Sequence, residues 1–253
     1  MVFDNIIEFS IHKNLAEMEV IKPYPIKKTL PEWFKKVEVH SVDNKNIKGC
    51  IPFLDGISAG YVLPLPQDFH LSYNIYNPKT EKKQSSYGFA FGESFFRDGD
   101  CVKYNLNTNI QQQHPLDQVG GINSFLARKN GQNDIIKILN PWKIKTPPGY
   151  SCLFVSPFYN EMDYFYILNA IVDTDRFDDC INFPIIINND KYPSFRKTFK
   201  QGTPYVQIIP FKREPWKFKI KSFDKNIVKN KFDYFSKIIN RYKTLIWERK
   251  KWN

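Results

Sequence analysis

Histidine and cysteine are scarce in this sequence, which holds four of each among 253 residues. The cysteines lie far apart and form no C-x-x-C pair, which argues against a disulfide framework or a zinc site; they are Cys50, Cys101, Cys152 and Cys180. An iron site on a β-barrel needs an H-x-D/E pair and a distant second histidine. The alternative of a site from His70, His114 and Asp117 has H-x-x-D spacing instead. We therefore predict no tightly bound metal and no cofactor.

Nucleotide-binding and nucleophile motifs are also missing. The chain contains no G-x-x-x-x-G-K-[ST], no G-x-G-x-x-G and no G-x-S-x-G, so P-loop chemistry, NAD-dependent hydride transfer and α/β-hydrolase chemistry are not expected. No apolar run approaches the roughly 20 residues that span a bilayer, and the first residues lack a basic n-region and a long h-region. We expect no membrane partner and a location in the cytoplasm, of a host cell or in a virion if the source is viral.

Positive charge is concentrated at the end of the chain. The formal net charge is +11, and residues 211–253 hold 14 Lys and Arg against 4 Asp and Glu, which leaves a net charge of +1 for residues 1–210. A basic tail of this kind favours a polyanion such as nucleic acid as a partner. The alternative is an amphipathic helix whose lysines form its solvated face.

The pattern within this tail changes after residue 221. Residues 216–221, WKFKIK, alternate apolar and basic side chains as a strand with one apolar face does. Beyond them, apolar residues recur every three or four positions, at Val228, Phe232, Phe235, Ile239, Tyr242 and Ile246. This spacing predicts a helix over 223–250 that packs on the domain formed by 1–222 or on a second subunit, so a homo-oligomer is one expected partner.

The rest of the chain is typical of an all-β domain. From residue 135, short apolar runs follow one another, separated by turn residues, and we expect at least six mostly antiparallel strands between 135 and 221. Helix is expected mainly at 30–37 and in a turn near 52–58, and 105–134 is interpreted as loop. The predicted fold class is mainly β, with a sandwich, jelly-roll or β-clip-like core and a C-terminal amphipathic helix.

Asp173 and Asp175 are the first candidate site residues. On a strand they share a face, and two neighbouring carboxylates can bind a divalent cation or separate their pKa values for acid/base catalysis. The structural alternative is a polar turn in which aspartates cap backbone groups. If the protein is an enzyme, these two residues are its predicted catalytic pair.

Five further residues are candidates for ligand binding. The rigid turn Thr146-Pro147-Pro148-Gly149 could present Tyr150 and Ser151 to a ligand, although it could equally serve only to aim the next strand. Gln207 is a polar residue inside an apolar run and needs partners or a ligand. Arg213 and Trp216 could clamp or stack on an anion. Structural hydrogen bonding is the alternative for all three of these side chains.

Four motifs carry a resemblance to a known family. They are NPWxIxTPPGYS at 140–151, VDTD at 172–175, INFP at 181–184 and GTPxxQxxPFKR at 202–213. The sequence resembles an uncharacterised family of marine phage and bacterial proteins, a domain of unknown function. The resemblance implies a phage-type source and no particular activity. The order of turns is also similar, at the level of fold alone, to that in dUTPase and dCTP deaminase proteins with a β-clip fold.

Two functions follow from these patterns. The first is a non-catalytic binding or assembly module. The second is a small-molecule or nucleotide-processing enzyme with an acidic site around Asp173 and Asp175. A deep pocket that gathers the two aspartates with Gln207 and Arg213 would favour the enzyme, and their dispersal over a filled sandwich would favour the module.

Overall fold

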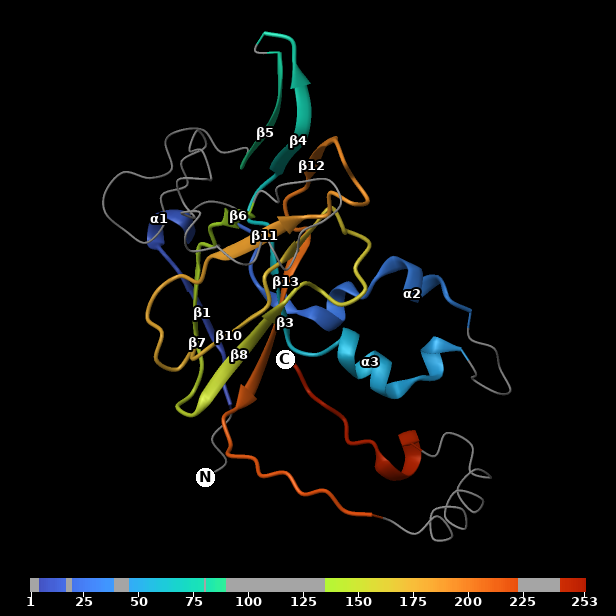
Figure 1. The fold of residues 1–253 in the computed structure, drawn as a ribbon. Coiled ribbons are helices and arrows are strands. Elements are labelled where there is room, and N and C mark those ends of the chain that lie inside the picture. Colours follow the sequence, from blue (N-terminus) through green and yellow to red (C-terminus); the bar gives the residue numbers. More distant parts are fainter. Residues whose placement is uncertain (1–4, 17–19, 39–45, 80, 90–134, 223–241) are drawn as a thin grey trace.

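The structure is a computed structural model in which antiparallel sheets stack around one core (Figure 1). It describes residues 5–16, 20–38, 46–79, 81–89, 135–222 and 242–253. The mainly β fold predicted from the sequence is confirmed, and every strand pair that the structure records is antiparallel. In the described ranges, no helix is long and apolar enough to cross a membrane.

A five-stranded sheet forms the centre of the fold. Its strands run in the order β10 (Ala170–Val172), β8 (Tyr150–Val155), β13 (Pro204–Lys212), β3 (Tyr61–Pro64) and β2 (Tyr24–Pro25). Gly60 lies where the chain enters β3, with φ at 76°, and a Cβ there would come within 1.9 Å of the Ile208 carbonyl oxygen. Only glycine permits this conformation and this approach of the two strands.

Three smaller sheets pack around the central one (Figure 1). One has the order β6 (Ile135–Ile138), β11 (Phe183–Ile187) and β9 (Phe165–Ile167). Another has the order β12 (Phe195–Phe199), β4 (Phe69–Asn77) and β5 (Lys82–Phe89), and β1 (Glu8–Ile11) pairs with β7 (Trp142–Lys145). The strand-rich segment expected between 135 and 221 therefore holds the strands β6 to β13, which confirms the expectation of at least six.

Alternating side chains from these sheets meet in one hydrophobic core. From the central sheet, Phe154 and Ile208 point inward and are completely buried, as are Leu63 of β3 and Ile185 of β11. Burial of each such side chain contributes roughly 1.5–3 kcal/mol before entropy costs. The apolar runs of the sequence are thus the strands whose inner faces form this core.

In the part of the chain that the structure describes, helix is confined to short segments. They are α1 (Lys13–Ala16), α2 (Glu32–Lys36), α3 (Ile51–Ile57), the 3-10 turns Ile26–Thr29 and Ile47–Gly49, and one π-helical turn at Tyr242–Ile246. The helix and the turn predicted near 30–37 and 52–58 correspond to α2 and α3. The two are joined by an aromatic cluster in which Phe53 lies 5.8 Å from Phe34 and 4.9 Å from Tyr159, centroid to centroid.

Two predictions for the tail require correction. The alternating segment 216–221 is extended but is not a sheet strand, because β13 ends at Lys212 and no described strand lies beside the continuation. Of the helix predicted over 223–250, residues 223–241 lie outside the described residues. Residues 242–246 form a single turn and 247–253 are irregular, so the helix does not extend to residue 250.

The irregular end of the chain docks beside α3. Trp247 Nε1 and Lys250 Nζ both donate to Asp55 Oδ2, at 2.8 and 2.9 Å. The ring of Trp252 packs edge-on against Tyr61, whose hydroxyl donates to the Asn253 carbonyl at 3.2 Å. In residues 242–253, these specific side-chain contacts hold the chain, and it is irregular after the turn at Tyr242–Ile246.

Candidate functional site

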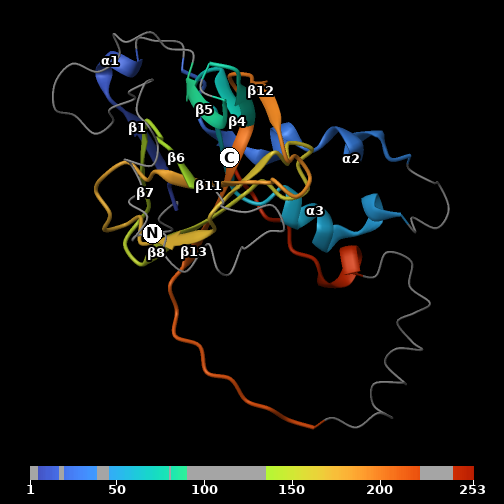
Figure 2. The same cartoon turned by 45° about the horizontal axis from the view of Figure 1, so that its top comes forward.

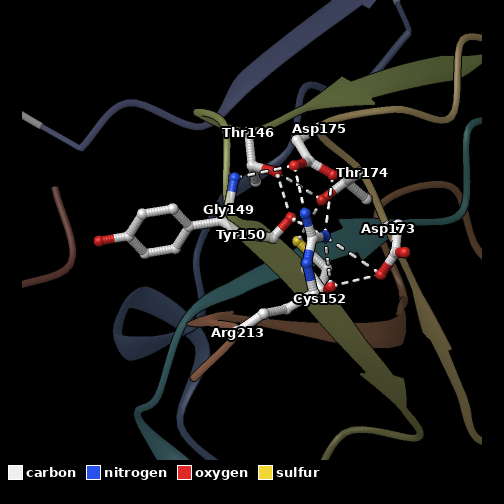
Figure 3. Close-up of polar contacts among 9 residues, drawn as sticks. Thr146, Gly149, Tyr150, Cys152, Asp173, Thr174, Asp175 and Arg213 are labelled. Atoms are coloured by element: carbon white, nitrogen blue, oxygen red, sulfur yellow. Dashed lines mark hydrogen bonds and ion pairs between the residues drawn. The ribbon is translucent and has the colours of Figure 1, made fainter. Parts of the chain in front are cut away.

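Arg213, immediately after β13, is the centre of a polar cluster (Figure 3). Its Nη1 donates to Asp175 Oδ1, to Ser151 Oγ and to the Tyr150 carbonyl, each at 2.9 Å, and its Nη2 donates to Asp175 Oδ2. Asp173 Oδ1 lies 3.1 Å from Nη1 and accepts the Ser151 hydroxyl at 2.7 Å. We call Ser151, Asp173, Asp175 and Arg213 the root cluster.

Strand register brings the root cluster together. Ser151 lies opposite Phe211 in the β8–β13 pair, and Val172, the residue before Asp173, lies opposite Cys152 in the β8–β10 pair. The ends of three adjacent strands therefore converge, although the residues are up to 62 positions apart in sequence.

The turn before β8 closes the cluster. Gly149 adopts φ of 85° and donates its N–H to Asp175 Oδ2 at 2.8 Å, while its carbonyl accepts the Arg213 N–H at 2.8 Å. Beside it, the hydroxyls of Thr146 and the buried Thr174 are 2.7 Å apart (Figure 3). The Pro-Pro-Gly turn thus aims β8 and binds the acidic turn, in line with the structural interpretation of both motifs.

Charge pairing governs the electrostatics of the root cluster. The Arg213 guanidinium, together with the Gly149 N–H, holds the pKa of Asp175 well below its usual range, and Asp175 in turn raises the pKa of Arg213. The Asp175 side chain is only 6% exposed, whereas that of Asp173 is 51% exposed. Asp175 is therefore an ionised partner of Arg213, and a cation bound by the two carboxylates would have to compete with the guanidinium.

The candidate residues do not all converge. Gln207 is fully buried away from the root cluster: its Oε1 accepts the Phe158 N–H at 3.1 Å, and its Nε2 donates to the carbonyls of Gly56 and Ala59 at 3.2 and 2.9 Å. These bonds satisfy the amide and join α3 to the central sheet. Tyr150 contributes its carbonyl to the root cluster, and Figure 3 shows its ring pointing away from Arg213. Where the structure describes the chain, no group of three or more His, Cys, Asp or Glu side chains could hold a metal.

The extended segment beyond the root cluster, residues 214–222, we call the arm. In two views it runs away from the sheets (Figures 1 and 2). Trp216, Phe218 and Ile220 are 88%, 91% and 89% exposed, and the lysines at 217, 219 and 221 alternate with them. Trp216 is thus one of three exposed apolar side chains on the arm, not a partner of Arg213 in a closed site.

Sequence reasoning missed an apolar row on the outer face of the central sheet. Ile171 of β10, Leu153 of β8 and Ile209 of β13 are cross-strand neighbours. Ile171 is 62% exposed, and Phe211, two residues beyond Ile209 on the same face, is 36% exposed. We call Leu153, Ile171, Ile209 and Phe211 the apolar row. The apolar row can be recognised only once the strand register is known. In the sequence, each of its residues belongs to an apolar run whose other side chains fill the core.

Comparisons with known proteins add little to this geometry. No protein-family model and no curated protein matches the chain. Among solved structures, the chain is similar to a dUTPase variant of Staphylococcus bacteriophage 80alpha, with a TM-score of 0.34 and 10% identity over 87% of this chain and 99% of that chain. At that level of similarity, function has to be argued from the residues themselves.

Proposed function

We propose that this protein is a non-catalytic assembly module that associates with a second copy of itself through the arm. The supporting observation is the exposure of Trp216, Phe218 and Ile220, which is close to complete. Soluble proteins rarely leave several large apolar side chains in line in water unless they mark an interaction site. The arm has one apolar face and one basic face, as a segment that packs on another surface does.

The apolar row supplies a matching surface on the partner copy. Side chains at alternate positions of an extended segment are about 6.6 Å apart, so the three on the arm span about 13 Å. A row across three strands spans about 10 Å, and Phe211 extends it along β13. Each apolar side chain buried contributes roughly 1.5–3 kcal/mol, and a two-fold dimer that exchanges arms buries three from each copy.

Backbone groups are complementary as well. The acidic turn that follows β10 is not a free counterpart for the arm's lysines, because Asp173 pairs with Arg213 and Asp178 pairs with Lys143 and Lys145. β10 is an edge strand, with no described strand on its free side. An extended segment can add to such an edge through main-chain hydrogen bonds while its side chains contact the row.

The arm is directed away from the row of its own copy. The root cluster fixes Arg213 to β8 and to the acidic turn through side-chain and main-chain bonds. Two residues later, Pro215 disfavours the helical conformation for Glu214 and keeps the chain extended. The arm therefore continues outward from the end of β13 instead of reversing over Ile209.

The pairing of Asp173 and Asp175 with Arg213 favours this function over the acidic enzyme. A divalent-metal or acid/base site needs carboxylates whose lone pairs and protons are free to change partners, and Asp175 is bound on both oxygens.

A polyanion partner for the tail remains the second candidate, because the three lysines of the arm are exposed. The phage-type source implied by the motifs stays a prediction.

Two matched triple variants test the proposal. In the first, Trp216, Phe218 and Ile220 are replaced by serine, and in the second, Lys217, Lys219 and Lys221 are replaced by serine. Sedimentation equilibrium should show that the wild type and the lysine variant self-associate and that the apolar variant is monomeric. A monomeric wild type would refute self-assembly. Binding of nucleic acid that is lost in the lysine variant and that falls steeply with added salt would instead support a polyanion partner.

A further inference from the structure

The hairpin formed by β4 and β5 extends beyond the sheet that holds it (Figure 1). The neighbouring strand β12 pairs with β4 only as far as Tyr73, which lies opposite Phe195. From Ile75 to Asn77, β5 is the one described strand that pairs with β4. Residues 74–79 and 81–85 therefore form a two-stranded projection past the end of β12, which we call the ribbon.

The base of the ribbon is fixed to the body of the protein. Asn74 has φ of 54° and lies at an irregularity in the pairing of β4 with β5, between Ser72 and Ile75. Its Nδ2 donates to the Pro193 carbonyl at 2.9 Å, and its own carbonyl accepts the Ser194 hydroxyl at 3.2 Å. A bulge bends a strand, so these contacts define the direction in which the ribbon leaves the sheet.

The ribbon carries positive charge on both of its faces. Lys82 lies opposite Asn77 and Lys83 lies opposite Tyr76, and neighbouring residues of a strand point to opposite faces. A third exposed lysine, Lys79, lies in the loop at the tip. Among the described residues, none of these three lysines has an ion-pair partner. Their charge is therefore available to a partner molecule.

This distribution of charge distinguishes between kinds of anionic partner. A flat anionic surface would be met by cations on one face, whereas a groove with negative charge on both walls is met by cations on two faces and at the tip. Arg196 of β12 adds an exposed cation at the base of the ribbon, opposite Ser72, and the Tyr76 ring is 58% exposed. The ribbon thus has the charge pattern that suits a nucleic acid groove.

We propose that the ribbon inserts into the major groove of double-stranded DNA. That groove is about 12 Å wide and about 8.5 Å deep, and it admits a two-stranded β-ribbon. Each strand residue adds about 3.3 Å, so residues 74–77 extend the ribbon by about 13 Å, which exceeds the depth of the groove. Lys82 and Lys83 then face the phosphates of opposite walls, and Lys79 reaches the floor.

The same geometry disfavours an RNA duplex, whose major groove is too deep and narrow for side chains to read. The ribbon is also a different surface from the arm and the apolar row, and its binding to DNA does not depend on self-association.

Two lysine variants of the full chain, matched in charge, test the proposal with a fluorescently labelled DNA duplex of about 20 base pairs at low salt. Lys79→Ser/Lys82→Ser/Lys83→Ser should weaken binding at least about 10-fold, as measured by anisotropy. The slope of log K against log salt should become shallower by about 1.8, because two phosphate contacts each contribute about 0.9. Lys217→Ser/Lys219→Ser/Lys221→Ser removes the same charge from the arm and should weaken binding less than about 3-fold.

The three ribbon lysines are exposed, so their replacement should leave Tm unchanged, which separates a loss of binding from a loss of folding. An RNA duplex of the same sequence should bind more weakly than the DNA duplex. The proposal is overturned if the wild type does not bind duplex DNA, if the two lysine variants lose equal affinity, or if DNA and RNA duplexes bind equally. Loss in the arm variant alone would also overturn it and would assign the polyanion to the tail.

Discussion

Asp175 and Arg213 form a bidentate ion pair that joins the turn after β10 to the end of β13. The pair places a fixed point immediately before the arm, and Asp173, Ser151 and the Gly149 carbonyl add contacts to the same residue. The two aspartates that resemble a catalytic pair in the sequence thus determine where the arm leaves the body.

Removing the charge of Asp175 should destabilise this junction. Asp175→Asn loses one half of the pair and leaves Arg213 without its main partner, so we expect a lower Tm in thermal unfolding. Asp173→Asn is the matched control, because that carboxylate is half exposed and should lower Tm much less. Equal losses in the two variants would contradict the central position of Asp175.

The pH dependence of this difference has a definite sign. The pKa of Asp175 is depressed in the folded protein, so the pair stabilises the fold at any pH above the pKa of an unfolded aspartate, about 4. The stabilisation is lost as pH falls below that value towards the folded pKa. The Tm difference between wild type and Asp175→Asn should therefore be constant from pH 7 to pH 5 and should shrink below about pH 4. A difference that already shrinks between pH 7 and pH 5 would contradict the assignment.

Gln207 should matter for stability. Gln207→Leu keeps the approximate volume but leaves the Phe158 N–H and the carbonyls of Gly56 and Ala59 without their partner in a buried site. We expect a loss of about 2–4 kcal/mol in the free energy of unfolding, measured by urea titration. A loss below about 0.5 kcal/mol would show that water replaces the amide.

The end of the chain should detach when Asp55 is removed. Asp55→Ala eliminates the acceptor of Trp247 Nε1 and Lys250 Nζ, so residues 247–253 should lose their anchor on α3. Hydrogen exchange of the Trp247 amide, which donates to the Tyr242 carbonyl, should then accelerate. Asp68→Ala is the control, because it breaks a comparable pair with Lys200 elsewhere in the fold. Unchanged exchange in Asp55→Ala would contradict the docking.

Much of the fold could be predicted because short alternating runs encode strands directly. The same alternation at 216–221 predicts an apolar face for this segment but could not reveal whether a neighbouring strand exists. That depends on where β13 loses its partners, after Lys212. The spacing of apolar residues near the C-terminus likewise could not show that Asp55 captures Trp247 in an irregular segment.

The sequence names the members of the root cluster as candidates but does not show their arrangement. The convergence of Ser151, Asp173, Asp175 and Arg213 depends on the pairing of β8 with both β10 and β13.

The central claim is that the arm of one copy contacts the apolar row of another. Trp216→Ser/Phe218→Ser/Ile220→Ser retains the row and loses the arm, whereas Ile171→Glu retains the arm and loses the row. Each variant alone should sediment as a monomer. An equimolar mixture should form a heterodimer, because one intact arm can still meet one intact row. A mixture that stays monomeric while the wild type associates, or Ile171→Glu that associates like the wild type, would contradict this assembly.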